Sequence, residues 1–410
     1  MLKALLGIHG QVVRSAQMGF RYSLYDYRIQ QDPYPVYARL RDEAPVYRNE
    51  DEDFWSLSRH EDVTAAFRDF RRFSNANGIL LEPSVWGPHA RTHASFLAMD
   101  PPEHTRIRGL VSKAFTPRRV AELEPRVRDI ARGHLDRALD GDEFDLVEDF
   151  AALLPMDVIS ELVGVPAADR AELRRLADAI VRHQEGVQDL SSAGRQAVRT
   201  LMGYFQGLIE ERRRERRNDL VSALLDAAEG DDRLTEGEAL GVIFILIAAG
   251  NETATNLISN AWHCAWWHLE RPSVAFDRIG DWIEETLRLE SPAQANGRTA
   301  TEEFTLHGVT VPAGARTLLV IGSANRDPRA FGDPDRFDLD RDTTAKISFG
   351  SGRHYCIGAH LARLETRVAL EELTARVSDY TIDESGARRI NSPYVRGFAC
   401  LPTAITSKRG

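Results

Sequence analysis

Cysteine and net positive charge are both scarce in this chain of 410 residues. The three cysteines, Cys264, Cys356 and Cys400, are an odd count without C-x-x-C spacing, so neither a disulfide framework nor a zinc site is indicated. The formal net charge is −10, which argues against nucleic acid or an anionic membrane surface as the main partner. So few cysteines fit a reducing cytoplasm.

The chain also lacks an apolar run long enough to cross a bilayer. The longest run, residues 239–250, ends at Asn251 and Glu252 and predicts a buried helix. Glycines interrupt the apolar stretch near the N-terminus, and no clear cleavage site of a signal peptide follows it. We therefore expect a cytoplasmic protein without a transmembrane segment, in which residues 1–30 form an N-terminal extension able to become a helix.

Helical periodicity dominates the sequence, and no stretch rich in Pro, Gly or Ser divides it into halves. Strand-like alternation occurs near 45–58, near 303–322 and toward the C-terminus. A hydrophobic share of 43% is enough for a sizeable core. These features predict one mainly α-helical domain with small β-sheets, spanning residues 31–410.

A T-x-x-E capping box at residues 235–238 predicts a helix that continues through the apolar run. Within this helix Ala249 and Gly250 lack bulk just where an acid and a hydroxyl, Glu252 and Thr253, follow. Polar groups inside an apolar helix cost stability unless they are used or satisfied. Two readings remain open: a functional site, or a threonine that bonds back to the carbonyl one turn earlier.

Three further segments place polar side chains where they can act together. Glu285 and Arg288 stand three apart in EETLR and can pair on a helix. His104 and Arg108, four apart, point the same way from a helix that follows two prolines. Arg298 leads into a strand-like segment beyond a helix-breaking proline.

The loop FGSGRHYCIG places Cys356 among three glycines, ahead of a segment with the pattern of an amphipathic helix. We expect Gly350, Gly352 and Gly358 to allow backbone conformations and close approach that a side chain would prevent. The start of the helix favours a thiolate, which is a metal ligand or a nucleophile. His354 is near enough to act as a base, but no hydrolase motif accompanies it. A single thiolate suits the axial position of haem iron.

Together these motifs resemble the cytochrome P-450 family of soluble bacterial haem-thiolate monooxygenases. FGSGRHYCIG fits the family signature F-G-x-G-x-[HR]-x-C-x-G at every fixed position. AGNET resembles the oxygen-activating helix, EETLR the E-x-x-R pair, and PDRF the segment that supplies the arginine closing that network. They occur in the family's order, from about Asp32 to the C-terminus, and one departure is Ala254, where relatives often have a second threonine. The resemblance implies a single-domain cytochrome P-450 fold.

The resemblance also implies a role for each motif residue. Cys356 would be the axial ligand of haem b iron, and four residues would hold the two propionates: His104, Arg108, Arg298 and His354. Other expected contacts of the cofactor are Phe349, Gly358, Ala249 and Gly250. Thr253 and Glu252 would deliver protons during oxygen activation. The structural network behind the haem would comprise Glu285, Arg288 and Arg336.

The implied reaction uses O2 and electrons from NAD(P)H, which a separate ferredoxin reductase and ferredoxin would supply to a monomeric enzyme. Residues in segments that flank the docking face of relatives, and that could form a basic patch for ferredoxin, are Arg118, Arg119, Arg353 and Arg363. The substrate would be a small apolar molecule, whose terpenoid, steroid, fatty-acyl, polyketide or aromatic nature stays open. Residues at pocket-lining positions of relatives are Ile79, Leu80, Leu81, Val85, Trp86, Leu246, Ala249, Ala293, Ala295 and Phe398.

Two alternatives remain. A haem-thiolate peroxygenase or isomerase would not need the acid–hydroxyl pair of AGNET. A haem-based gas sensor would need an output domain, for which the sequence shows no sign.

Overall fold

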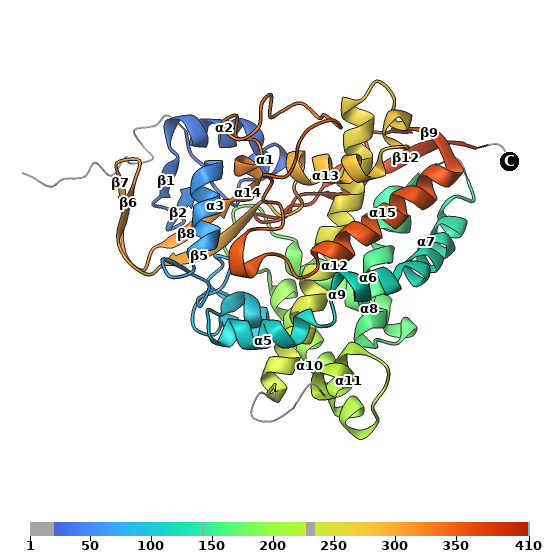
Figure 1. Ribbon diagram of the computed structural model, residues 1–410, viewed down its shortest axis with the longest axis horizontal. Coiled ribbons are helices and arrows are strands. Elements are labelled where there is room, and N and C mark those ends of the chain that lie inside the picture. Colours follow the sequence, from blue (N-terminus) through green and yellow to red (C-terminus); the bar gives the residue numbers. More distant parts are fainter. Residues whose placement is uncertain (1–19, 142, 227–233, 409–410) are drawn as a thin grey trace, which may run out of the picture.

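The computed structural model describes residues 20–141, 143–226 and 234–408, and it is mainly helical with small sheets, as the sequence predicts (Figure 1). The α-helices are α1 (Tyr27–Gln31), α2 (Tyr34–Glu43), α3 (His60–Arg68), α4 (Ala90–Ala94), α5 (Glu103–Ser112), α6 (Pro117–Glu122), α7 (Glu124–Ala138), α8 (Leu153–Val163), α9 (Arg170–Val181), α10 (Ser192–Arg214), α11 (Leu220–Asp226), α12 (Glu236–His268), α13 (Ile279–Leu289), α14 (Ile321–Ala324) and α15 (Ala359–Arg376). The strands are β1 (Val46–Asn49), β2 (Phe54–Leu57), β3 (Phe73–Ser74), β4 (Glu143–Asp145), β5 (Ala295–Ala300), β6 (Phe304–Leu306), β7 (Val309–Val311), β8 (Arg316–Val320), β9 (Val377–Ile382), β10 (Arg388–Arg389), β11 (Phe398–Cys400) and β12 (Pro402–Ser407).

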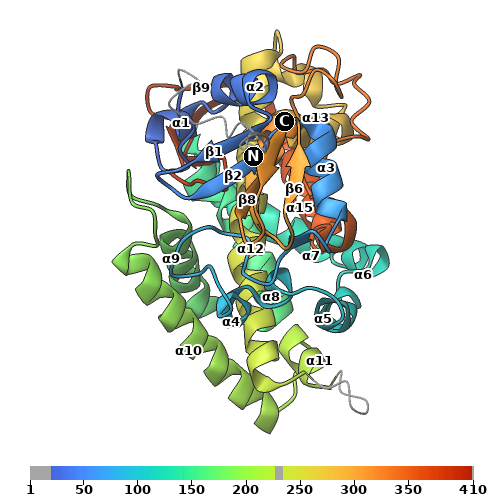
Figure 2. The same ribbon diagram turned by 90° about the vertical axis from the view of Figure 1, so that its left-hand side faces the viewer.

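Helix α12 runs through the middle of the molecule in both views (Figures 1 and 2). The expected capping box begins it: Thr235 Oγ1 accepts from the N–H of Glu238, and the Glu238 carboxylate accepts from the N–H of Thr235 at 2.8 Å. Among the described residues α12 is the one helix long and apolar enough to cross a membrane, yet 67% of its apolar stretch is buried inside the protein. It is therefore a core helix.

The largest sheet has the strand order β1-β2-β8-β5-β3. Strands β1 and β2 form the hairpin expected near 45–58, with Val46 opposite Leu57. Strand β8 is parallel to β2 and antiparallel to β5. Strand β5 also pairs with β3, so it has a neighbour on each side. Arg298 faces Thr317 in this register, which fixes its backbone within a sheet. Smaller sheets pair β4-β12-β9, β6-β7 and β10-β11.

Some residues before the expected boundary at residue 30 contribute to the core. Tyr22, Leu24 and Tyr25 are buried and pack with Phe54 and Leu318 in one apolar cluster. These side chains of the segment before α1 thus belong to the core of the domain. Burial of the large aromatic rings of Tyr22 and Tyr25 favours this packing. Residues 1–19 of the expected extension lie outside the described residues.

Candidate active site

The loop that precedes α15 turns sharply around Cys356. Its N–H donates to the carbonyl of Phe349 at 2.9 Å, which closes the loop. Gly350 and Gly352 have φ angles of +72° and +71°, in the region that favours glycine. A Cβ on Gly352 would lie 2.8 Å from the carbonyl oxygen of Phe67, so a side chain cannot fit there. These two glycines have the role expected from the sequence.

Gly358 differs from that expectation. Its φ is −84°, and a Cβ there would make only an ordinary contact of 3.9 Å with Cys356 Sγ. Its backbone instead acts on the thiol, because its N–H hydrogen bond lowers the pKa of Cys356, as do Arg108 and Arg363. Desolvation by the atoms of the surrounding loop outweighs them and raises the pKa of this thiol, although the residue as a whole is exposed. A cation bound to the sulfur would therefore be needed to keep the thiolate that the sequence predicts.

The three cysteines have different surroundings. Cys356 is exposed, whereas Cys264 and Cys400 are buried. Burial raises the pKa of Cys264, and Cys400 donates to a carboxylate oxygen of Asp145 at 2.6 Å. Of the three, only Cys356 is free to bind a ligand.

Four cationic or hydrogen-bonding side chains gather beside the Cys356 loop. The rings of His104 and His354 are 4.1 Å apart between centroids. All four of their ring nitrogens are buried and have no hydrogen-bond partner among the described residues. Arg298 is buried against the ring of Phe67, with its guanidinium carbon 5.1 Å from the ring centroid. Arg108 donates to the carbonyl of Tyr355 at 2.5 Å, and this bond ties α5 to the loop.

The positive charge of this cluster comes from Arg108 and Arg298, which disfavour protonation of the two histidines beside them. Burial, reinforced by Arg108, lowers the pKa of His104 to about 4. Burial and the neighbouring Arg298 lower the pKa of His354 to about 2, and burial lowers the pKa of Arg298 to about 10. Buried cations and unpartnered donors are costly alone, and carboxylates would satisfy them. The cluster is suited to a ligand with two negative charges.

On α12 the AGNET residues lie as one helical turn. Thr253 Oγ1 donates to the carbonyl of Ala249 at 2.8 Å, which is the back-bonded geometry considered from the sequence. Glu252 is buried, and burial, followed by the charge of Asp178, raises its pKa to about 7. A carboxyl with this pKa can both hold and release a proton at neutral pH. The threonine bond is compatible with function, because its oxygen keeps lone pairs free to accept.

The structural network around EETLR contains a different arginine from the one expected. Glu285 and Arg288 are buried and joined by two bonds of 2.6 and 2.8 Å. The second guanidinium on Glu285 belongs to Arg341, at 3.1 Å. Arg336 contributes its main-chain carbonyl, which accepts from Arg288 and Arg341, while its side chain is exposed. The assignment of Arg336 as the third partner is therefore wrong in its side chain.

Comparisons with known proteins agree with this geometry. The sequence profile of the cytochrome P450 family matches residues 280–395. A Mycobacterium tuberculosis protein described as cytochrome P450 123 is 49% identical to this chain, over 94% of this chain and 96% of its own length. Cytochrome P450 monooxygenase PikC of Streptomyces venezuelae is 39% identical over 92% of both chains. The structure of cytochrome P450 CYP109Q5 from Chondromyces apiculatus is similar with a TM-score of 0.83 at 36% identity, covering 94% and 98% of the two chains.

The chain belongs to the cytochrome P450 family. Members of this family are monooxygenases that bind haem and use O2, so this P450 is an oxidoreductase of that kind. The residues present fit the cofactor, because an accessible thiol lies beside buried donors that lack an anion. Cys356 would hold the iron, as in cytochromes P450 generally, and His104, Arg108, Arg298 and His354 would hold the propionates.

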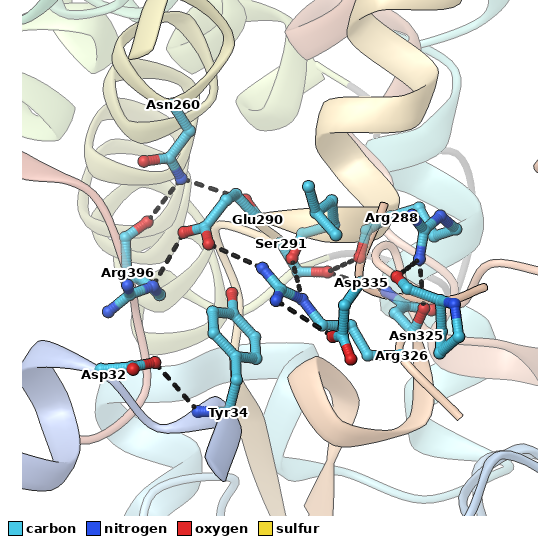
Figure 3. A network of polar contacts seen from close by, with 12 residues as sticks. Asp32, Tyr34, Asn260, Arg288, Glu290, Ser291, Asn325, Arg326, Asp335 and Arg396 are labelled. Atoms are coloured by element: carbon cyan, nitrogen blue, oxygen red, sulfur yellow. Dashed lines mark hydrogen bonds and ion pairs between the residues drawn. The ribbon is translucent and has the colours of Figure 1, made fainter. Parts of the chain in front are cut away.

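A second buried network of this P450, centred on Glu290, joins residues that are far apart in the sequence (Figure 3). Glu290 accepts from Arg326 and from Arg396, both at 2.8 Å, and Arg389 approaches it at 3.5 Å. The arginines lower the pKa of Glu290 against the effect of burial, so it stays ionised. Asn260 of α12 donates to the main-chain carbonyls of Glu290 and Arg396, which ties the central helix to the C-terminal loops.

The residues expected to line the substrate pocket divide into groups. Leu81 and Ala295 are buried in the apolar cluster that contains Tyr22, and Leu246 is buried in the main core. Ala249 is exposed, and residues with partial exposure are Ile79, Leu80, Val85, Trp86 and Ala293. Phe398 packs on His263, with ring centroids 4.8 Å apart.

The position of Phe398 is incompatible with the pocket. His263 lies ten residues beyond Thr253 on α12, about 15 Å along the helix axis. Phe398 also pairs with β10 and lies under the guanidinium of Arg389, at 4.1 Å. The structure thus removes Phe398 from the expected pocket.

Proposed function

We propose that this P450 inserts one oxygen atom of O2 into a small apolar organic molecule, by hydroxylation or epoxidation. Electrons come from NAD(P)H through a separate ferredoxin reductase and ferredoxin, and the enzyme works as a cytoplasmic monomer. The observation that supports oxygen insertion over isomerisation is the pair formed by Glu252, with a pKa near 7, and Thr253. An isomerase has no need of such a proton source.

Each residue of the site has a definite task in this proposal. Bound haem supplies the oxygen-activating chemistry, which thiolate donation from Cys356 favours. Glu252 holds a proton on its buried carboxyl and releases it near neutral pH. Thr253 Oγ1 donates to Ala249 and can accept through its lone pairs, so it orients a proton carrier beside the oxygen site. The apolar residues of α12 on either side exclude bulk water.

The face near the cysteine loop is suited to an acidic electron donor. Arg118 and Arg119 on α6, and Arg353 beside Cys356, are exposed. Helix α6 packs against α15, the helix that follows the loop. Arg363, expected in the same patch, is half-buried and donates to Glu284 at 2.6 Å, a carboxylate that Lys346 also contacts, and Arg118 pairs with Glu122 at 3.2 Å on the surface. The three exposed arginines can steer an acidic ferredoxin although the whole chain is negative.

Apolar side chains near the site support the proposal of an apolar substrate. Ile79, Val85 and Trp86 lie on the loop that packs on β5 beside Arg298. Among similar proteins, CYP109E1 of Bacillus megaterium has a structure in complex with testosterone, and a mutant of P450 EryK has one with erythromycin B. We propose an apolar ligand of comparable character for this chain.

The test starts with a screen for compounds that shift the spin state of the ferric haem. Binders are then incubated with NAD(P)H, ferredoxin reductase and ferredoxin under ¹⁸O2, and the products are weighed by mass spectrometry. We expect a product with one labelled oxygen that disappears when ferredoxin is left out. Turnover with hydrogen peroxide alone, or a product rearranged without added oxygen, would overturn the proposal.

A further inference from the structure

A buried histidine–carboxylate pair joins two segments that are far apart in the sequence. His183 Nε2 lies 3.0 Å from Glu82 Oε1, and their side chains are 5% and 0% exposed. Glu82 belongs to the loop between β3 and α4, and His183 follows the end of α9. A second contact supports the first, because Asp189 accepts from the N–H and the hydroxyl of Ser84 at 3.1 and 2.5 Å.

The surroundings hold this contact in place from two more segments. Tyr27 donates its hydroxyl to the carbonyl of His183, and the N–H of His183 donates to Asn391. Tyr394 accepts from the N–H of Leu81 at 2.7 Å, next to Glu82. Figure 2 shows the connection between α9 and α10 extending toward α1, the helix that begins at Tyr27.

The joined segments lie on two sides of the active site. On one side the loop is bonded to β5, since the N–H of Gly297 donates to the carbonyl of Ile79 at 2.7 Å, one residue before Arg298. On the other side α9 packs against α12, the helix that carries Glu252 and Thr253. The segment that follows His183 borders an open groove of about 600 Å³, whose mostly polar lining includes Arg28, Glu52, Glu185 and Gln188 beside Tyr25.

We propose that His183 and Glu82 form a latch that closes the substrate entrance of this P450 and that loosens as the pH rises. A bulky molecule that passes from the groove toward α12 must part the two segments, and parting them breaks a buried pair. The inference rests on the positions of these segments and is independent of the substrate and electron donor proposed above.

The sign of the pH effect follows from the two nitrogens of His183. Nδ1 lies 3.0 Å from the carbonyl of Val181 and Nε2 faces Glu82, so both nitrogens face acceptors. The charged imidazolium satisfies both, whereas the neutral ring has one N–H and satisfies one. Burial alone lowers the pKa of His183, but the bond and charge of Glu82 and the charge of Asp189 outweigh it and raise the pKa.

The closed latch is therefore most stable below the ordinary pKa of histidine and loses this stability as the pH rises through the raised value. Other ionisable groups around the contact are Tyr25, Tyr27 and Tyr394, with Glu185 and Arg182 on the same segment as His183 and Arg316 on β8. The tyrosines have raised pKa values and stay neutral through this range.

The test measures how fast a bulky haem ligand, 4-phenylimidazole, reaches the ferric haem-loaded enzyme in a stopped-flow instrument between pH 5.5 and 9. We expect Glu82→Gln to bind faster than the wild type at acidic pH by about tenfold or more, the scale for losing one partner of a buried pair. The ratio of the two rates cancels protonation of the probe itself, and it should approach one at alkaline pH. His183→Gln should give a ratio of the same form.

A matched control is His307→Gln, which removes a histidine paired with Asp62 at 2.8 Å on another face of the protein. It should follow the wild type at every pH. Amide exchange of residues 79–86 and 182–190 in the wild type should speed up over the same pH range beyond the intrinsic rate, a readout that needs no variant. Rates that stay equal in the wild type and both latch variants, or protection that is indifferent to pH, would overturn the latch.

Discussion

Replacing Arg341 by methionine is expected to lower the free energy of unfolding by about 2–4 kcal/mol. Its guanidinium donates to Glu285 at 3.1 Å and to the carbonyls of Asp333 and Arg336 at 2.9 and 3.1 Å. A hydrogen bond to a charged group contributes about 1.5–3 kcal/mol, and methionine fills most of the volume without donating. The loss stays below that of a fully unpaired carboxylate, because Arg288 still binds Glu285. A few kcal/mol is a large share of a typical total of about 5–15 kcal/mol.

The matched control is Arg336→Met, five positions earlier in the same segment. The side chain of Arg336 is exposed, so its loss should change the free energy by at most about 0.5 kcal/mol. Urea unfolding of the haem-loaded proteins, followed by circular dichroism and by the Soret band, measures both variants. Equal effects, or a larger effect for Arg336, would refute the assignment of Arg341 as the arginine that closes the network.

Three further predictions concern the active site and its electron supply. Cys356→His should abolish the red-shifted Soret band of the reduced carbonyl complex while Cys264→Ala keeps it; survival of the band in the first variant contradicts thiolate ligation. Thr253→Ala should bind haem and consume NAD(P)H but release more oxygen as peroxide, and unchanged coupling contradicts its role. Reduction by ferredoxin under carbon monoxide should slow as salt screens charges beyond about 10 Å at 0.1 M, and again when Arg118 and Arg119 are both changed to Glu; indifference to both excludes charge-guided docking.

The features that the sequence predicted well depend on residues close together in the chain. The capping box of α12, the β1–β2 hairpin and the φ angles of Gly350 and Gly352 each involve a handful of consecutive residues. The pairing of Glu285 with Arg288 follows from helical spacing alone. Short-range geometry is set by backbone sterics and helix periodicity, which a sequence displays directly.

The features that the sequence did not reveal depend on which distant segments meet. Glu290 binds arginines 36, 99 and 106 positions away, and no spacing rule connects them. Glu82 and His183 are separated by 101 positions. Arg336 and Arg341 lie in one segment, and the turn of the chain there decides which side chain points to Glu285. The expectation that Phe398 lines the substrate pocket was wrong for the same reason, because the register of β11 turns its side chain toward His263.

The contrast among buried cations is the strongest reason to place the cofactor where we do. Arg288 and Arg396 are buried, and each lies against a carboxylate of the chain itself. Arg298 is equally buried, and no ion pair to it occurs among the described residues, while His104 and His354 beside it leave every ring nitrogen without a partner. A chain with 62 acidic residues has carboxylates available for each of these sites. Leaving one cluster without them is costly unless a bound molecule brings its own, and the two propionates of haem would do so beside the accessible thiol of the loop.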